Sequence, residues 1–132
     1  MKILSIKSRK DFLRAGEKTG IAARGKNMVI LSRDTDRKYT EQAIYQRIGE
    51  FVRIGLVVTK KISKKAVVRN RIKRRIRAIN NMILLNHCNL YINNTDYVIV
   101  LRRNISDVDH LKLLEDIKNL LSEIRVKHER NQ

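Results

Sequence analysis

Apolar residues recur at helical spacing in two long segments of the chain. In residues 65–86 they fall within an arc of roughly 80° when each residue turns by about 100°. That stripe consists of Val68, Ile72, Ile76, Ile79 and Ile83. A second stripe near the end of the chain consists of Leu113, Ile117, Leu120, Leu121 and Ile124. A narrow apolar stripe is typical of a helix that packs one face on a core, so we expect two amphipathic helices.

Shorter apolar runs elsewhere predict strands. Residues 51–59 form the clearest one, because they are rich in β-branched residues and include Gly55 as a bulge or close-approach site. Residues 96–102 and 27–32 are similar runs, and residues 21–23 lie between two glycines. Together with the helices, these runs predict one α+β domain that spans residues 1–132 and has a small central sheet.

Local signals predict where the remaining helices and loops lie. Residues 8–16 indicate a short first helix capped by Ser8. Ser106 is the expected cap of the last helix, with Asp109 completing a capping box. Residues 33–50 are polar and long for a loop, so we expect a mobile segment with a helical turn around residues 41–47. Residues 127–132 are expected to fray.

Composition narrows the classes of protein. The 132 residues are 42% hydrophobic, which suffices for one domain with a buried core. No apolar run approaches the ~20 residues that span a bilayer, and the first residues lack the apolar core of a signal peptide. Cys88 is the single cysteine, so an internal disulfide is excluded and a reducing cytoplasm is expected.

Positive charge is the dominant chemical feature. The net charge is +17, which indicates a nucleic acid or an anionic membrane surface as partner. We expect no membrane, because the apolar face of the basic helix carries Ile and Val where a membrane-bound helix carries bulky aromatics. We expect no DNA either, because a helix-turn-helix motif needs a short helix where residues 51–59 form a strand.

The charge is concentrated in residues 60–77, which contain ten basic residues and no acidic one. On the helical wheel, the polar side opposite the apolar stripe holds Arg69, Asn70, Lys73, Arg74 and Arg77. Arg71 and Arg75 flank the stripe. A solvated charged face is the alternative, but such faces usually mix both signs to gain i,i+4 ion pairs. We therefore expect guanidinium and ammonium groups presented together to phosphates.

The sequence contains no residue pattern that is typical of a catalytic site. The three histidines are far apart and match no metal-ligand spacing, and the adjacent pair His87 and Cys88 lacks the geometry of a thiol–imidazole couple. No phosphate-binding glycine loop occurs. If the protein takes part in phosphodiester hydrolysis, another component must supply the metal ions and the nucleophile.

One stretch resembles a known family. Its residues are Gly55, Leu56, Val58, Thr59, Lys60 and Lys61, then Ala66, Val67, Arg69, Asn70, Arg71, Lys73, Arg74 and Arg77. This strand followed by a basic helix resembles the protein subunit of bacterial ribonuclease P. An early Asp-Phe pair, a strand reading DYVIV and a closing amphipathic helix extend the similarity more loosely over the whole chain.

The resemblance implies a fold and a partner. The fold is α-β-β-β-α-β-α with a left-handed β-α-β crossover around the basic helix, a handedness that pattern alone would not predict. The partner is a large catalytic RNA that uses Mg²⁺ to remove the 5′ leader of precursor tRNA, while no metal ion is assigned to the protein. The alternatives are a ribosomal or RNA-chaperone domain without a role in cleavage, and a nuclease that needs no RNA partner.

The resemblance also implies two sets of contact residues. The first set is expected to bind RNA and consists of Lys60, Lys61, Lys64, Lys65, Arg69, Asn70, Arg71, Lys73, Arg74 and Arg77; Arg71 could instead brace the fold. The second set is expected to line a cleft for the single-stranded leader and consists of Phe12, Met28 and Arg53. Phe12 could equally pack in the core. Gly16 and Met28 stand where the family often has aromatics, which leaves room for contacts to backbone phosphates.

Overall fold

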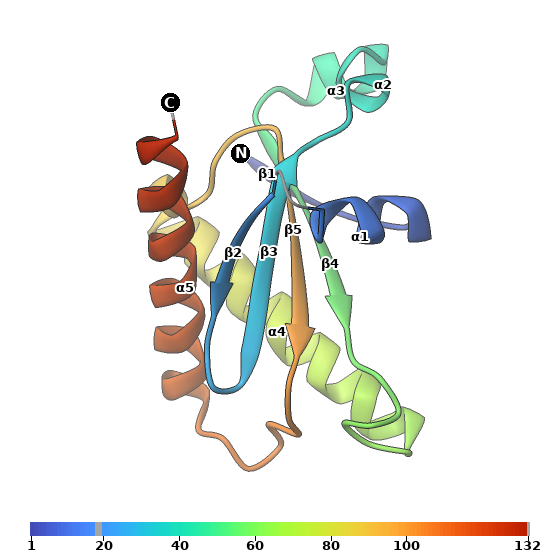
Figure 1. Ribbon diagram of the computed structural model, residues 1–132, viewed down its shortest axis with the longest axis vertical. Helices are drawn as coiled ribbons and strands as arrows, with labels where there is room; N and C mark the ends of the chain where they lie inside the picture. Colours follow the sequence, from blue (N-terminus) through green and yellow to red (C-terminus); the bar gives the residue numbers. More distant parts are fainter. Residues whose placement is uncertain (18–19, 132) are drawn as a thin grey trace.

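A five-stranded sheet with strand order β1-β4-β5-β3-β2 forms the centre of the molecule (Figure 1). The computed structural model describes residues 1–17 and 20–131. Its strands are β1 (Lys2–Ser5), β2 (Ile21–Arg24), β3 (Met28–Asp34), β4 (Phe51–Val57) and β5 (Thr95–Leu101). β1, β4 and β5 are parallel, whereas β3 runs antiparallel to both β5 and β2. The chain is therefore one α+β domain built on a mixed, open sheet.

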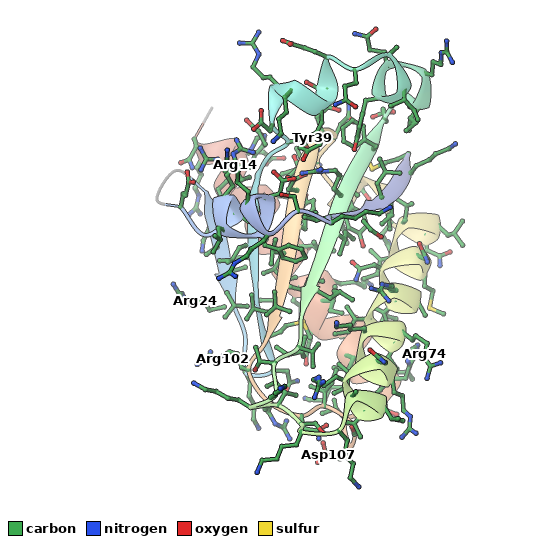
Figure 2. All side chains as sticks on the ribbon, turned by 90° about the vertical axis from the view of Figure 1, so that its right-hand side faces the viewer. Arg14, Arg24, Tyr39, Arg74, Arg102 and Asp107 are labelled. Carbon is green, nitrogen blue, oxygen red and sulfur yellow. The ribbon has the colours of Figure 1, made fainter. Side chains whose placement is uncertain are left out.

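Helices cover both faces of this sheet. They are α1 (Arg9–Ala15), α2 (Arg37–Thr40), α3 (Ala43–Ile48), α4 (Ala66–Asn86) and α5 (His110–Arg130), with a 3-10 turn η1 (Cys88–Leu90). The two long helices, α4 and α5, lie on one face, and α1 crosses the other (Figures 1 and 2). The short helices α2 and α3 sit at one end of the sheet, beyond α1.

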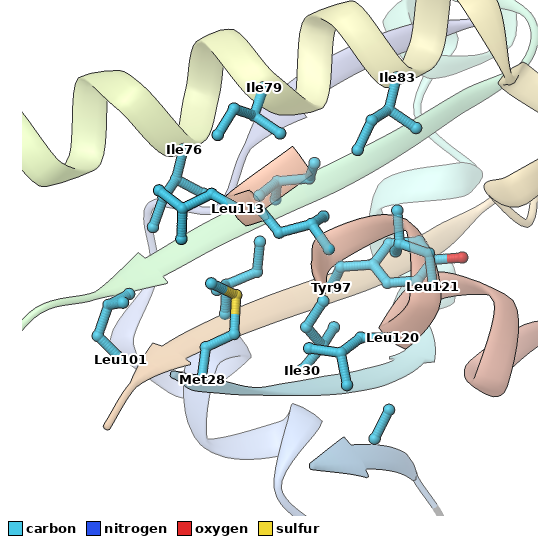
Figure 3. Packing of buried hydrophobic residues seen from close by; sticks show 14 of the residues in the cluster. Met28, Ile30, Ile76, Ile79, Ile83, Tyr97, Leu101, Leu113, Leu120 and Leu121 are labelled. Carbon is cyan, nitrogen blue, oxygen red and sulfur yellow. The ribbon is translucent and has the colours of Figure 1, made fainter. Parts of the chain in front are cut away.

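Alternation along the strands decides which side chains meet which helices. In β5, Tyr97, Ile99 and Leu101 point into the main core with α4 and α5, while Val98 points to the α1 side. Figure 3 shows the main core from close by, where isoleucines of α4 and leucines of α5 pack together with strand residues such as Met28 and Ile30. The larger core therefore lies between the sheet and the long helices, and α1 covers a smaller one.

The connection from β4 to β5 is left-handed. Both strands point down in Figure 1, β5 lies to the left of β4, and α4 passes behind the sheet between them. Nearly all such crossovers are right-handed. The arrangement implied by the family resemblance is therefore present, and it places the N-terminal end of α4 beside the loop that leaves β4.

Most elements appear where the pattern predicts them, with three differences. β1 was not predicted, because a four-residue strand gains its stability from pairing with the distant β4. In the segment 33–50, the expected helical turn around residues 41–47 is present as α3, but the segment also contains the end of β3 and the helix α2. The expected Ser106 cap is wrong, since α5 begins at His110 and the Ser106 hydroxyl donates to Asn104. The helix α5 continues to Arg130, and the expected fraying of residues 127–132 stays a prediction; residue 132 lies outside the described residues.

Candidate nucleic-acid interface

The helix α4 has the two faces that its sequence predicts. Its buried residues include Ile72, Ile76, Ile79 and Ile83, each no more than 1% exposed, and Val68 is half-buried at its first turn. On the outer side, Asn70, Arg71, Arg74 and Arg77 are exposed, while Arg69 and Lys73 are half-buried. Burial of the isoleucines fixes the rotation of the helix about its axis. The same rotation directs most of its cationic groups to the surface.

Four lysines extend this surface along the loop before α4. Lys60, Lys61, Lys64 and Lys65 are all exposed. The loop is held in place by Arg69, whose Nη1 donates to the carbonyl oxygens of Ser63 at 2.9 Å and Lys64 at 3.0 Å. Arg69 therefore orders the lysine-bearing turn, which is a structural role that sequence reasoning did not assign to it. We call residues 60–77 the basic surface.

One arginine of α4 braces the fold from within the basic surface. Arg75 donates from Nη1 to the carbonyl oxygen of Ile105 at 3.0 Å and from Nη2 to that of Val108 at 2.8 Å. It thereby fixes the loop between β5 and α5 against α4. Arg71, for which a bracing role was left open, is exposed instead. Of the two arginines that flank the apolar stripe, Arg75 therefore braces the fold and Arg71 lies exposed at the surface.

The basic surface has no acidic partner within the part of the chain that the structure describes. No ion pair among residues 1–17 and 20–131 joins a cation of residues 60–77 to a carboxylate. Self-repulsion among these cations opposes folding, and a polyanion would relieve it. The arrangement suits a nucleic-acid backbone, for which arginine offers paired donors and lysine offers point charges.

On the opposite face of the sheet, Phe12 lies against Gly55. A Cβ placed on Gly55 would stand 2.4 Å from Cε1 and 2.7 Å from Cζ of the Phe12 ring, so only glycine leaves room for it. Phe12 is half-buried and, like Leu31, Val57 and Val100, packs against the small buried cluster of Ile6, Ala15 and Val98. Gly55 is therefore the close-approach site that its position in the strand suggested. The ring of Phe12 both packs and remains partly accessible.

Met28 does not reach this face. It is 0% exposed and belongs to the main core, on the side of α4 and α5. Its strand neighbours Val29 and Leu31 have the opposite orientation and point to the α1 side. The prediction that Met28 lines a leader cleft with Phe12 is therefore wrong. Val29 and Leu31 are the residues of β3 that lie on the face of Phe12.

The prediction that Arg53 lines the leader cleft is also wrong, because its side chain is buried in a network of charged groups. Its side chain is 3% exposed, with Nε donating to Oδ1 of Asp96 at 2.7 Å and Nη2 to Oδ2 at 2.6 Å. Its guanidinium also lies 4.3 Å from the ring centroid of Tyr39. Burial by itself would lower the pKa of Arg53, but the hydrogen bond and charge of Asp96 outweigh it and hold the pKa above its ordinary value. Arg53 therefore serves the fold.

Asp11 completes this network, a role that the sequence analysis did not assign to it. It is 1% exposed, and its Oδ2 lies 3.3 Å from Nη2 of Arg53. Neither carboxylate oxygen accepts a hydrogen bond within the described residues. Thr35 donates to Asp96 at 2.8 Å, so the network joins α1, β4, β5 and the end of β3. Asp11 and Arg53 also line a hollow of about 520 Å³ toward α2 and α3.

Within residues 1–17 and 20–131, no group of three or more His, Cys, Asp or Glu side chains could hold a metal ion. Cys88 is exposed at the end of α4. Among the same residues, no helix is long and apolar enough to cross a membrane.

Comparisons with known proteins agree with this geometry. The family described as Ribonuclease P matches residues 1–125. Ribonuclease P protein components from Cyanothece and Stutzerimonas stutzeri are 43% identical over 77 residues and 32% identical over 96 residues. These alignments cover 58% and 73% of this chain, and 55% and 60% of the relatives. The chain thus spans little more than half the length of the curated relatives it matches.

Solved structures show the same fold. The RNase P protein from Thermotoga maritima has a TM-score of 0.67 and 27% identity, covering 91% of this chain and 96% of that one. An RNase P protein from Staphylococcus aureus has a TM-score of 0.63 and 25% identity, covering 89% and 91%.

Proposed function

The chain belongs to the ribonuclease P protein family, and from this membership we propose that it is the protein subunit of a ribonucleoprotein that removes the 5′ leader from precursor tRNA. In this proposal the partner RNA carries out the hydrolysis with Mg²⁺, in the cytoplasm. The protein contributes binding to that RNA and to the leader.

The basic surface is the observation that carries the proposal. It presents lysines on an ordered turn and arginines on one side of a helix whose opposite side is buried. Neutralising phosphates releases counterions from RNA, which makes binding strongly dependent on salt. We assign the contact with the catalytic RNA to this surface, with Arg74 and Arg77 among its exposed residues.

The division of labour follows from the residues that are available. The described part of the chain gathers no acidic cluster that could bind the metal ions of a hydrolytic site. Its contribution is then to hold substrate and catalytic RNA together and to screen their mutual repulsion. Screening of this repulsion by the protein would matter most at low Mg²⁺, because fewer divalent ions are then present to screen it.

The leader is assigned to the α1 side of the sheet. Phe12 is a partly accessible aromatic ring on this face, and stacking on an aromatic side chain is a usual way to bind single strands without sequence preference. Because Met28 lies in the main core and Arg53 is buried in its ion pairs with Asp11 and Asp96, we assign their place to the aliphatic residues of this face, Leu31, Val57 and Val100. The leader therefore binds on one face of the sheet and the catalytic RNA on the other.

Reconstitution tests the proposal. The protein is mixed with a bacterial ribonuclease P RNA and a precursor tRNA at low Mg²⁺, and cleavage is measured. We expect the protein to stimulate cleavage and the variant Arg74→Glu with Arg77→Glu to lose that stimulation while unfolding at an unchanged temperature. Arg69 is left intact because it orders the turn. The matched control reverses two exposed cations of α5, Lys112→Glu with Arg130→Glu.

Three outcomes would contradict the proposal. RNA binding without stimulation would favour a ribosomal or chaperone-type domain. Cleavage by the protein without added RNA would identify a nuclease. Equal stimulation by the reversed variant and the wild type would show that α4 is not the contact surface.

A further inference from the structure

A hollow of about 520 Å³ lies between β1 and α1 on one side and the short helices α2 and α3 on the other. The short helices sit beyond α1 at one end of the sheet (Figure 1). Residues 60–77 of the basic surface contribute nothing to its lining. A volume of this order is typical of a site for a small molecule. The hollow is therefore a candidate site that is separate from the RNA contact on α4.

Two charged side chains form the buried end of this hollow. Asp11 and Arg53 line it, although they are only 1% and 3% exposed. Arg53 directs Nε and Nη2 to the carboxylate of Asp96. Its Nη2 also lies 3.3 Å from Oδ2 of Asp11. Two carboxylates thus share one guanidinium, and the network carries one negative charge in excess.

The carboxylate of Asp11 retains its capacity to accept hydrogen bonds. Neither of its oxygens accepts one from a donor within residues 1–17 and 20–131. Asp96, by contrast, accepts from both Thr35 and Arg53. An ionised carboxylate offers about four acceptor sites, and leaving them unused in a buried position is costly. A group that brings N–H donors together with a positive charge would therefore suit Asp11.

Apolar and aromatic side chains make up the walls of the hollow. They come from β1, α2 and α3 and are Ile3, Leu4, Tyr39, Ile44, Tyr45 and Ile48. The ring centroids of the two tyrosines lie 5.9 Å apart. Ile44 is 61% exposed, so the walls reach the solvent and leave the hollow open to a ligand. Apolar walls around a few polar groups are the usual composition of a small-molecule site.

An anion or a metal ion suits the hollow less well than an organic cation. An anion would meet the charge of Asp11, while the guanidinium of Arg53 is already paired with Asp96. Mg²⁺ and Ca²⁺ require several oxygen ligands, and the described residues gather no group of three or more side chains that could supply them. Lys7 lies at the rim and forms no ion pair with Asp11 within the described residues. The carboxylate thus remains available to an external donor.

We infer that this hollow binds a small primary amine, whose ammonium group donates hydrogen bonds to Asp11 and whose apolar body packs against Ile44 and Tyr45. Charge-assisted hydrogen bonds of this kind are about twice as strong as neutral ones. Because the chain has a net charge of +17, a cation is repelled at long range, and its binding depends on the local excess of negative charge at Asp11. The inference goes beyond the proposed function, since no RNA takes part in it.

The test titrates the isotope-labelled full chain, without RNA, with phenethylamine and follows its amide proton–nitrogen correlation spectrum. Phenethyl alcohol, which has the same apolar body and no charge, is the comparison ligand. We expect the amine to shift the amide signals of Asp11 and Tyr45 in a saturable manner and to give one dissociation constant. The alcohol should bind at least about tenfold more weakly, because it lacks the charge-assisted hydrogen bond.

Two pairs of variants locate the site. Asp11→Asn should weaken amine binding at least about tenfold, whereas Asp109→Asn, which removes the same charge at an exposed position before α5, should leave it unchanged. Ile44→Ala should weaken it about threefold through lost apolar contact, and Leu85→Ala, on the exposed end of α4, should have no effect. Ile44 and Leu85 are both exposed, so this second pair decides the matter even if Asp11→Asn fails to fold.

Several results would overturn the inference. It is wrong if the amine causes no saturable shifts, because water is then the only occupant of the hollow. It is also wrong if the amine and the alcohol bind equally, or if folded Asp11→Asn binds the amine as tightly as the wild type. Equal binding by Ile44→Ala and Leu85→Ala would place the amine elsewhere. None of these results bears on the proposed function, which is tested with RNA and precursor tRNA.

Discussion

The ring of Phe12 occupies the space in which any side chain on Gly55 would have to lie, 2.4 Å from where its Cβ would be. One residue earlier on α1, Asp11 lies beside Arg53, two residues before Gly55 on the same face of β4. Two adjacent contacts thus fix α1 to the sheet, one by shape and one by charge. These contacts therefore also set which part of that face of the sheet α1 covers.

Replacing Gly55 by alanine should destabilise the protein. The new methyl group would collide with the Phe12 ring, and overpacking of this kind typically costs about 1–3 kcal/mol. Denaturant unfolding monitored by circular dichroism measures the change in the free energy of unfolding. The same substitution in a Phe12→Ala background should cost much less, because the ring is gone. An equal cost in both backgrounds would mean that the collision is not the cause.

Removal of Arg53 should be among the most damaging single changes. Arg53→Ala leaves the carboxylates of Asp11 and Asp96 buried without a cation, a situation that costs about 3–5 kcal/mol. Asp11→Asn should cost less, because it removes only the ion pair with Arg53 and leaves Arg53 with its hydrogen-bonded partner Asp96. Thermal unfolding of both variants provides the comparison. A larger loss for Asp11→Asn than for Arg53→Ala would contradict this reading of the network.

Two neighbouring arginines of α4 should separate stability from RNA binding. Arg75→Gln removes two hydrogen bonds to the loop before α5 and should lower the free energy of unfolding by about 1–3 kcal/mol. Arg74→Gln removes an exposed side chain and should leave stability within about 0.5 kcal/mol. In affinity for the catalytic RNA, the order should reverse, with the larger loss for Arg74→Gln. RNA affinity and the free energy of unfolding are measured on both variants. The prediction fails if one variant shows the larger loss in both.

Tyr97 should make the fold sensitive to alkali. Burial raises the pKa of Tyr97 to about 12, against about 10 in an unfolded chain. Between these values the unfolded tyrosine releases its proton while the folded one keeps it, so stability falls as pH rises through this range, by up to about 3 kcal/mol.

The variant Tyr97→Phe isolates this effect from other titrations. At pH 7 it should be less stable than the wild type by about 1 kcal/mol, because the phenol oxygen no longer accepts the hydrogen bond from the Ile92 N–H. Near pH 12 its disadvantage should vanish or reverse. Urea unfolding at pH 7, 10 and 11.5 gives the three values, and parallel curves for the two proteins would rule the mechanism out.

Much of the fold was readable because its signals are local. The isoleucine stripe of α4 predicts both the helix and its rotation, and the structure confirms the burial of Ile72, Ile76, Ile79 and Ile83. The strands from β2 to β5 were located from short apolar runs between turn residues. β1 was missed because its four residues carry no periodic signal and form a strand only through pairing with β4. The ends of helices were predicted least well, since α5 begins at His110 and Ser106 was the expected cap.

The candidate site was predictable on one side of the sheet only. On α4, the spacing of charged and apolar residues places the cations outward. On the α1 side, alternation indicates that Met28 and Leu31 point to opposite faces but does not say which face receives α1. That choice depends on packing against α4 and α5, and it buried Met28. Arg53 looked available because nothing near it in sequence reveals the two carboxylates that surround it.

The sequence by itself determined that this protein is a basic α+β domain with one helix divided into a core face and a cationic face. It could do so because helical and strand periodicity are properties of neighbouring residues. Only the tertiary structure decided the left-handed path of α4, the contact of Phe12 with Gly55 and the buried pairing of Arg53 with Asp11 and Asp96. Those features depend on residues far apart in the chain, whose meeting is set by the packing of the whole domain.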